Sequence, residues 1–141
     1  MDIPNFNGWV QFKDYKCITG VGLRGVYILA HFSHKPSSPP KLTSANIIYV
    51  GETTGQTIAK RLYQFSQSAF FAKRGHSGGL TYSNQFLKGV PNVAPPENLY
   101  VAILPVDRPE KEGKAFIKLI ERAVIWEFFK KNGDYPACNT A

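Results

Sequence analysis

Two stretches of sequence decide the fold: RGVYILAHF at residues 24–32 and NIIYVG at residues 46–51. Both are rich in β-branched and aromatic residues and are bounded by turn-forming residues, which is typical of β-strands. The segment between them, SHKPSSPPKLTSA at residues 33–45, contains three prolines and four serines. This composition predicts a loop. It is longer than most connections between paired strands, so we expect a functional insertion there.

The second strand leads into QTIAKRLYQFSQSAFF at residues 56–71, where Ile58, Leu62, Phe65 and Ala69 recur at helical spacing. Residues 72–96 are rich in glycine and proline and predict an irregular excursion with one short helix near residues 82–88. Residues 97–106 (ENLYVAILPV) predict a third strand.

Residues 108–131 predict the longest helix, because apolar residues recur along it with helical period. Asn132 and Gly133 follow it as a left-handed C-cap. The order of elements predicts a small α+β fold, a three-stranded, mostly antiparallel sheet flanked by helices. We expect one domain over residues 1–141, with insertions at 33–45 and 72–96.

Composition excludes several classes of protein. Of the 141 residues, 43% are hydrophobic and 13% aromatic, which excludes an intrinsically disordered chain. No apolar run approaches the roughly 18–20 residues that span a bilayer, so we expect no membrane partner. The first residues lack the features of a signal peptide, and two cysteines are too few for a disulfide framework. We therefore expect a reduced, cytoplasmic protein.

Positive charge is unevenly distributed along the chain. The formal net charge is +7, and between Asp14 and Glu97 the only acidic residue is Glu52. A one-sided positive field attracts polyanions such as nucleic acid. A generic basic domain remains the alternative on charge alone.

Five sequence elements occur in a fixed order. They are Gly25-Val26-Tyr27, Tyr49-Val50-Gly51, Arg61 on the following helix, Glu121-Arg122-Ala123-Val124-Ile125, and Pro136-Ala137-Cys138-Asn139. In this order they resemble the GIY-YIG nuclease superfamily over nearly the whole chain. Both tripeptides have Val where the family name has Ile, which fills a similar core position.

The resemblance implies a metal-dependent phosphodiesterase that acts on DNA. It implies Glu121 as the protein ligand of Mg²⁺, with Mn²⁺ as a substitute, and Arg61 as the group that grips the scissile phosphate. A planar guanidinium suits that task. Tyr27 is expected to take a proton from the attacking water and Tyr49 to position it, since a nearby cation favours the phenolate. The structural alternatives are a solvated helix glutamate paired with Lys118, a surface arginine and half-buried strand tyrosines.

Two further residues complete the expected catalytic set. Asn139 matches a terminal asparagine of the family and should hydrogen-bond neighbouring backbone. Many members carry His or Tyr one helical turn after the arginine, where this chain has Phe65. His76, in the following glycine-containing loop, is a candidate for the missing imidazole, and Lys41 is a weaker candidate for lowering the pKa of Tyr27.

The two insertions are the expected recognition surface, and such embedded insertions look most like the restriction-endonuclease branch. The nucleic-acid contacts that we expect are the basic residues Lys41, Lys60, Lys73, Arg74 and Lys88. We expect double-stranded DNA as the partner, with a homodimer left open. The competing hypothesis is a nucleic-acid-binding module of the same fold without cleavage activity, which Phe65 favours.

Overall fold

The computed structural model describes residues 2–140. Four antiparallel strands form the central sheet in the order β1-β4-β2-β3. They are β1 (Val10–Gln11), β2 (Gly25–His31), β3 (Ile47–Thr53) and β4 (Leu99–Pro105). The predicted α+β class is confirmed, and the three predicted strands are present. The strand β1 is an addition, because two residues are too short to leave an alternating pattern in sequence.

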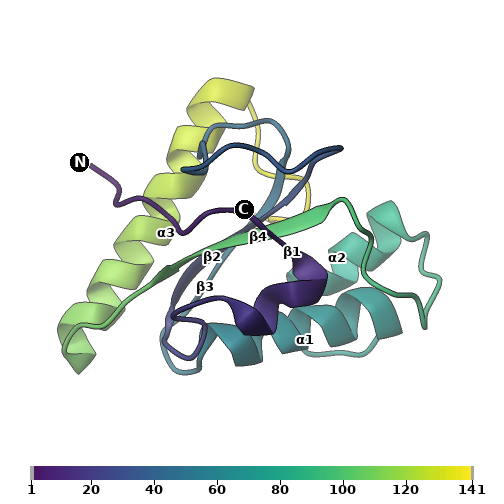
Figure 1. The fold of residues 1–141 in the computed structure, drawn as a ribbon, viewed down its shortest axis with the longest axis horizontal. Coiled ribbons are helices and arrows are strands. Elements are labelled where there is room, and N and C mark those ends of the chain that lie inside the picture. Colours follow the sequence, from purple (N-terminus) through teal and green to yellow (C-terminus); the bar gives the residue numbers. More distant parts are fainter. Residues whose placement is uncertain (1, 141) are drawn as a thin grey trace.

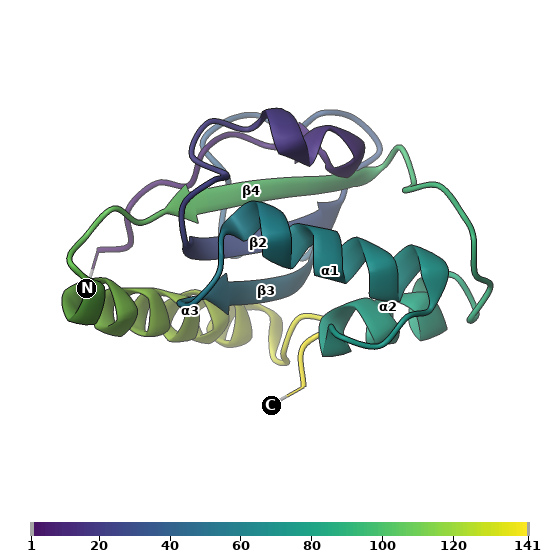
Figure 2. The ribbon, with the colours of Figure 1, turned by 90° about the horizontal axis from the view of Figure 1, so that it is seen from below.

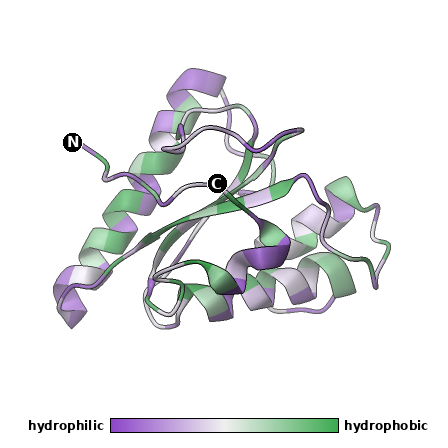
Figure 3. Ribbon diagram, in the orientation of Figure 1, coloured by the Kyte–Doolittle hydropathy of each residue, from purple (hydrophilic) through white to green (hydrophobic). Residues whose placement is uncertain are grey.

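Helices cover both faces of this sheet (Figure 1). On one face lies α3 (Glu110–Asn132), and on the other lie α1 (Ile58–Phe71) and α2 (Ser77–Phe86). A short 3-10 helix, η1 (Phe12–Cys17), packs with α1 and α2. Figure 3 shows the central strands largely in the hydrophobic colour and both ends of α3 in the hydrophilic one.

The alternation of side chains along β2 divides the core into two clusters. Val26, Ile28 and Ala30 pack towards α3, while Tyr27 and Leu29 pack towards α1. Because the strand is buried on both faces, its sequence is a continuous apolar run rather than an alternating one.

Each helix end has a local cause. Thr57 caps α1, its hydroxyl accepting a hydrogen bond from the Lys60 N–H at 3.0 Å. Gly133 ends α3 with φ +80°, which confirms the predicted left-handed cap. The prediction of a short helix near residues 82–88 was wrong in its bounds, since α2 begins at Ser77.

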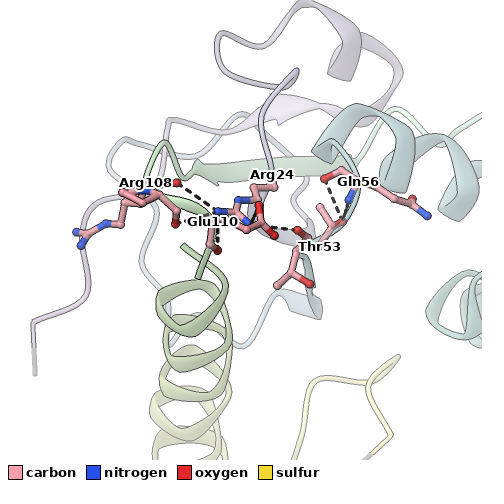
Figure 4. A network of polar contacts seen from close by, with 7 residues as sticks. Arg24, Thr53, Gln56, Arg108 and Glu110 are labelled. Atoms are coloured by element: carbon pink, nitrogen blue, oxygen red, sulfur yellow. Dashed lines mark hydrogen bonds and ion pairs between the residues drawn. The ribbon is translucent and has the colours of Figure 1, made fainter. Parts of the chain in front are cut away.

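The start of α3 is tied to the loop after β3 by Arg24 (Figure 4). Its guanidinium donates to the carbonyl oxygens of Thr54, Arg108 and Glu110 at 3.0–3.3 Å. It also pairs with the Glu110 carboxylate at 3.4 Å. These contacts fix α3 against the sheet and so fix the position of every side chain that α3 carries.

The C-terminal segment covers the free edge of β3 (Figure 2). The Cys138 N–H donates to the Ile48 carbonyl at 2.7 Å. The Asn139 amide pairs with both backbone groups of Val50, at 2.9 Å each. The side chain thus continues the hydrogen-bonding ladder of the sheet, and the edge is closed.

Candidate functional site

The register between β2 and β3 brings the two tyrosines together on the face that α1 and α2 cover. Tyr27 pairs with Gly51 and Leu29 with Tyr49, which leaves the two phenol rings 6.0 Å apart between centroids. A Cβ at Gly51 would lie 2.6 Å from the Tyr27 oxygen and 2.7 Å from the Tyr49 ring. Only glycine permits this approach, which accounts for Gly51 beside the tyrosine pair.

His76 joins the same group from the start of α2. Its Nε2 lies 2.9 Å from the Tyr27 hydroxyl, and its ring lies 5.4 Å from the Tyr49 ring between centroids. The Ser68 hydroxyl accepts a hydrogen bond from the His76 backbone N–H at 3.0 Å. The structure therefore brings together His76 and the tyrosines, which the sequence placed on separate elements.

The hydrogen bonds of His76 determine where its proton lies. Nδ1 accepts from the Gly79 backbone N–H at 3.1 Å, so that nitrogen carries no proton. Burial, reinforced by the nearby Arg61 guanidinium, lowers the pKa of His76 from 6.5 to about 3. The ring is neutral near pH 7, its proton sits on Nε2, and Nε2–H donates to the Tyr27 oxygen.

Because the Tyr27 oxygen accepts this hydrogen bond, the proton of its hydroxyl points away from His76. Burial raises the pKa of Tyr27 well above 10, and its neighbour Tyr49 raises it further. Arg61 acts in the opposite direction and does not outweigh burial. The expectation of a lowered pKa at Tyr27 is therefore wrong, because a fully buried phenol loses more hydration on ionising than one guanidinium returns.

Tyr49 is the less buried residue of the pair. Burial raises its pKa, the Arg61 charge lowers it, and the Glu121 charge raises it. The donors run in one direction, from Gly79 to His76 and from His76 to Tyr27. Arg61 favours the phenolate of both residues, and the deeper burial of Tyr27 makes negative charge less favourable there than at Tyr49.

Arg61 lies one turn inside α1 and faces this group. Its Nη1 donates to Gln64 Oε1 at 2.8 Å and to the Gly75 carbonyl at 3.2 Å. The hydrogen bond to Gly75 fixes the loop between α1 and α2 that carries His76. The guanidinium is partly exposed, so the rest of its donors remain available to an anion.

Phe65 is a core residue. It is fully buried, and its ring lies edge-on to His76 at 5.3 Å and close to the rings of Tyr82 and Phe12. Phe65 therefore supports the imidazole that bonds to Tyr27 rather than leaving a gap in the site.

Glu121 approaches from α3 on the other side of β3. With Tyr49, Ser77, Cys138 and Asn139 it lines a polar cavity of about 220 Å³ beside the closed edge of β3. Its side chain is 20% exposed, and the ion pair that it makes is with Arg122, at 3.7 Å, rather than with Lys118. Asn139 holds the wall of this cavity, as expected.

The charge of the Glu121 carboxylate is only partly compensated by the nearby Arg122 and Lys118. Burial raises the pKa of Glu121, these two cations lower it, and the nearby Glu52 also raises it. Glu52 Oε2 is buried and has no hydrogen-bond partner among residues 2–140. A divalent cation would relieve both carboxylates, so the residues fit such an ion, although no group of three or more metal-ligating side chains occurs within residues 2–140.

The basic residues predicted to contact nucleic acid, Lys41, Lys60, Lys73, Arg74 and Lys88, are all exposed. Lys41 lies in the loop whose Leu42 packs on the cluster facing α3, while Tyr27 belongs to the opposite cluster. The prediction that Lys41 lowers the pKa of Tyr27 is wrong.

Sequence reasoning missed the residues that hold His76. Ser68 and Gly79 bond to it, and a Cβ at the neighbouring Gly78 would lie 2.5 Å from the Tyr49 ring. It also missed Glu52 and the hydrogen bond between His31 Nε2 and the Tyr82 hydroxyl at 2.9 Å. The two adjacent glycines after His76 were the available signal, because they imply close approach of another group.

Comparisons with family models, with curated proteins and with solved structures find no match to this chain. Membership of the GIY-YIG superfamily stays a prediction. Among residues 2–140, none of the helices has the length and apolar character needed to span a bilayer.

Proposed function

We propose that this protein is a divalent-metal-dependent endonuclease of GIY-YIG type that hydrolyses phosphodiester bonds in DNA. The observation that carries the proposal is the convergence of Tyr27, Tyr49, Arg61, His76 and Glu121 around one edge of β3. Phosphodiester hydrolysis needs an anion-binding group, a proton acceptor for water and compensation of charge on the leaving oxygen. These residue types supply the first two.

We assign the residues to two layers. Tyr27 and His76 are buried, at 0% and 1% exposure, and act as an internal hydrogen-bond relay. Tyr49 and Arg61 form the rim that meets the substrate. Arg61 binds a phosphate oxygen and Tyr49 orients the attacking water. Tyr49 accepts a proton from that water only as the phenolate, a form that the Arg61 charge favours and that burial and the Glu121 charge disfavour.

Glu121 would hold the cation, with Glu52 beside it and Asn139 fixing the wall of the cavity. A bound Mg²⁺ or Mn²⁺ supplies Lewis-acid stabilisation of charge on the phosphate. Glu121 lines this cavity and Arg61 does not, so the two residues would attract different parts of the substrate.

Cleavage of supercoiled plasmid tests the proposal. Wild-type protein should nick or linearise the plasmid in Mg²⁺ or Mn²⁺ and not in EDTA. Glu121→Gln should reduce the rate on the order of a hundredfold or more, because it removes an electrostatic contribution of that size. The matched control is Glu127→Gln on the same helix, which removes a carboxylate paired with Lys130 outside the cavity. It should cut at the wild-type rate.

Two results would overturn the proposal. One is a Glu121→Gln variant that cuts at the wild-type rate. The other is wild-type protein that binds DNA without cutting it in either metal, which would support the binding module without cleavage activity.

A further inference from the structure

Three aromatic side chains gather at the C-terminal end of α3: Trp126, Phe129 and Tyr135, here called the aromatic platform. Trp126 is 57% exposed and Tyr135 is 38% exposed, whereas the other tryptophan of the chain, Trp9, is 3% exposed. Exposed apolar area of this kind marks a binding surface.

The platform has the shape of a stacking site. The rings of Trp126 and Phe129 are nearly parallel, at 17° with centroids 6.3 Å apart, and Tyr135 stands edge-on to Phe129 at 5.3 Å. Together with Arg122 and Ile125 they line a hollow of about 230 Å³. A flat aromatic floor beside a guanidinium suits a planar ligand that carries negative charge.

This hollow adjoins the candidate active site. Arg122 and Ile125 line both the platform and the cavity that contains Glu121 and Tyr49. The Arg122 side chain is 72% exposed. Lys130 places its ammonium 5.6 Å from the Trp126 ring, while also pairing with Glu127.

We propose that the aromatic platform binds an unpaired base of a DNA strand next to the phosphate that is cut. This inference rests on the proposed nuclease function and adds a substrate class to it, DNA with an unstacked nucleotide beside the cleavage position. Bases stack on exposed aromatic rings without regard to sequence, and Arg122 is placed for the adjoining phosphate. The positive side chains around the platform favour a nucleic acid over a second copy of this basic chain.

Binding in EDTA at fixed salt tests the platform without any cleavage. The probes are a short single-stranded oligothymidylate and a duplex of the same length, and the signal is tryptophan fluorescence. The single strand should quench the emission of wild-type protein but not of Trp126→Phe, which assigns the quenching to Trp126. A ring remains in Trp126→Phe, so anisotropy of a labelled strand should show binding that is reduced but retained.

Trp126→Ala should weaken binding of the single strand by roughly tenfold or more, the usual effect of removing one stacking ring, and should change duplex binding little. The control is Leu119→Ala, also on α3 and 52% exposed, which should bind like wild type. Equal affinity of wild type and Trp126→Ala for the single strand would overturn the inference. So would self-association that only the wild type shows, since a second copy would then occupy the platform.

The outcomes separate this inference from the proposed function. If the protein cleaves plasmid but the single strand does not quench its fluorescence, the platform inference is rejected and the proposed nuclease function stands. If the single strand quenches wild-type protein and Trp126→Ala loses binding, but wild-type protein cuts no DNA, the platform inference stands and the proposed nuclease function is rejected.

Discussion

Acidification should destabilise the protein through His76. The unfolded chain takes up a proton at this residue near pH 6.5, while the folded protein does so only near pH 3. Between these values the unfolded state binds more protons, so the free energy of unfolding falls as pH falls. From pH 8 to pH 4 the loss through His76 alone is about 3 kcal/mol, at about 1.4 kcal/mol per pKa unit.

The groups around His76 are consistent with this sign. Tyr27 and Tyr49 stay neutral in this range because burial raises the pKa of each phenol. The Arg61 charge disfavours a proton on the imidazole. No carboxylate is among the causes that shift the pKa of His76.

Urea unfolding at pH 8 and pH 4 measures the effect. The comparison variant is His76→Gln, whose amide retains one acceptor and one donor but does not titrate. It should be less stable than wild type at pH 8, by about 1–3 kcal/mol for disturbed buried hydrogen bonds. Its further loss on acidification should be smaller than that of wild type by about 3 kcal/mol.

Subtracting the acid-induced loss of stability of His76→Gln from that of wild type cancels the contributions of the other titrating groups. Burial lowers the pKa of His31 and raises that of Glu121, and both groups are common to the two proteins. His34→Gln, at an exposed histidine, should match wild type at both pH values. Equal acid-induced losses in wild type and His76→Gln would refute the buried, neutral imidazole.

Two predictions concern the packing around the site. Phe65→His should lower the free energy of unfolding by about 3 kcal/mol or more, because it places a polar ring in a fully buried aromatic cluster. Urea unfolding measures this loss, and a loss below about 1 kcal/mol would contradict the assignment of Phe65 to the core. Asn139→Ala should lower the free energy of unfolding by about 1–3 kcal/mol, because it leaves both backbone groups of Val50 unpaired. The control Thr140→Ala, at the exposed neighbour, should leave stability unchanged. Equal stability of the two variants would show that the edge of β3 does not need Asn139.

The elements with strong local patterns were predictable from sequence. Residues 24–32 predicted β2 to within one residue at each end, because a buried central strand is a continuous apolar run. The cap of α3 was predictable because Asn132-Gly133 is a local signal. The predicted bounds of α2 were wrong because Gly78 and Gly79 are poor helix formers and argued against a helix at these positions. Gly78 is nevertheless required there, since the Tyr49 ring leaves no room for a Cβ.

The candidate site depended on contacts that local sequence does not encode. Tyr27 and His76 are 49 positions apart, and Val50 and Asn139 are 89 apart. Sequence supplied the residue types of both pairs but not their partners. It also gave no measure of burial, which reverses the expected pKa direction of Tyr27.

The central claim is that phosphodiester hydrolysis occurs at the partly buried rim formed by Tyr49 and Arg61, with Tyr49 acting on water and Tyr27 buried behind it. The most direct test is the single-turnover rate of DNA cleavage in Mg²⁺ for wild type, Tyr49→Phe and Tyr27→Phe, with DNA affinity measured in EDTA. Tyr49→Phe should retain its affinity and lose roughly 10²–10⁴ in rate, and Tyr27→Phe should lose less rate but more stability. A Tyr49→Phe variant that cuts at the wild-type rate while Tyr27→Phe does not cut would contradict the account.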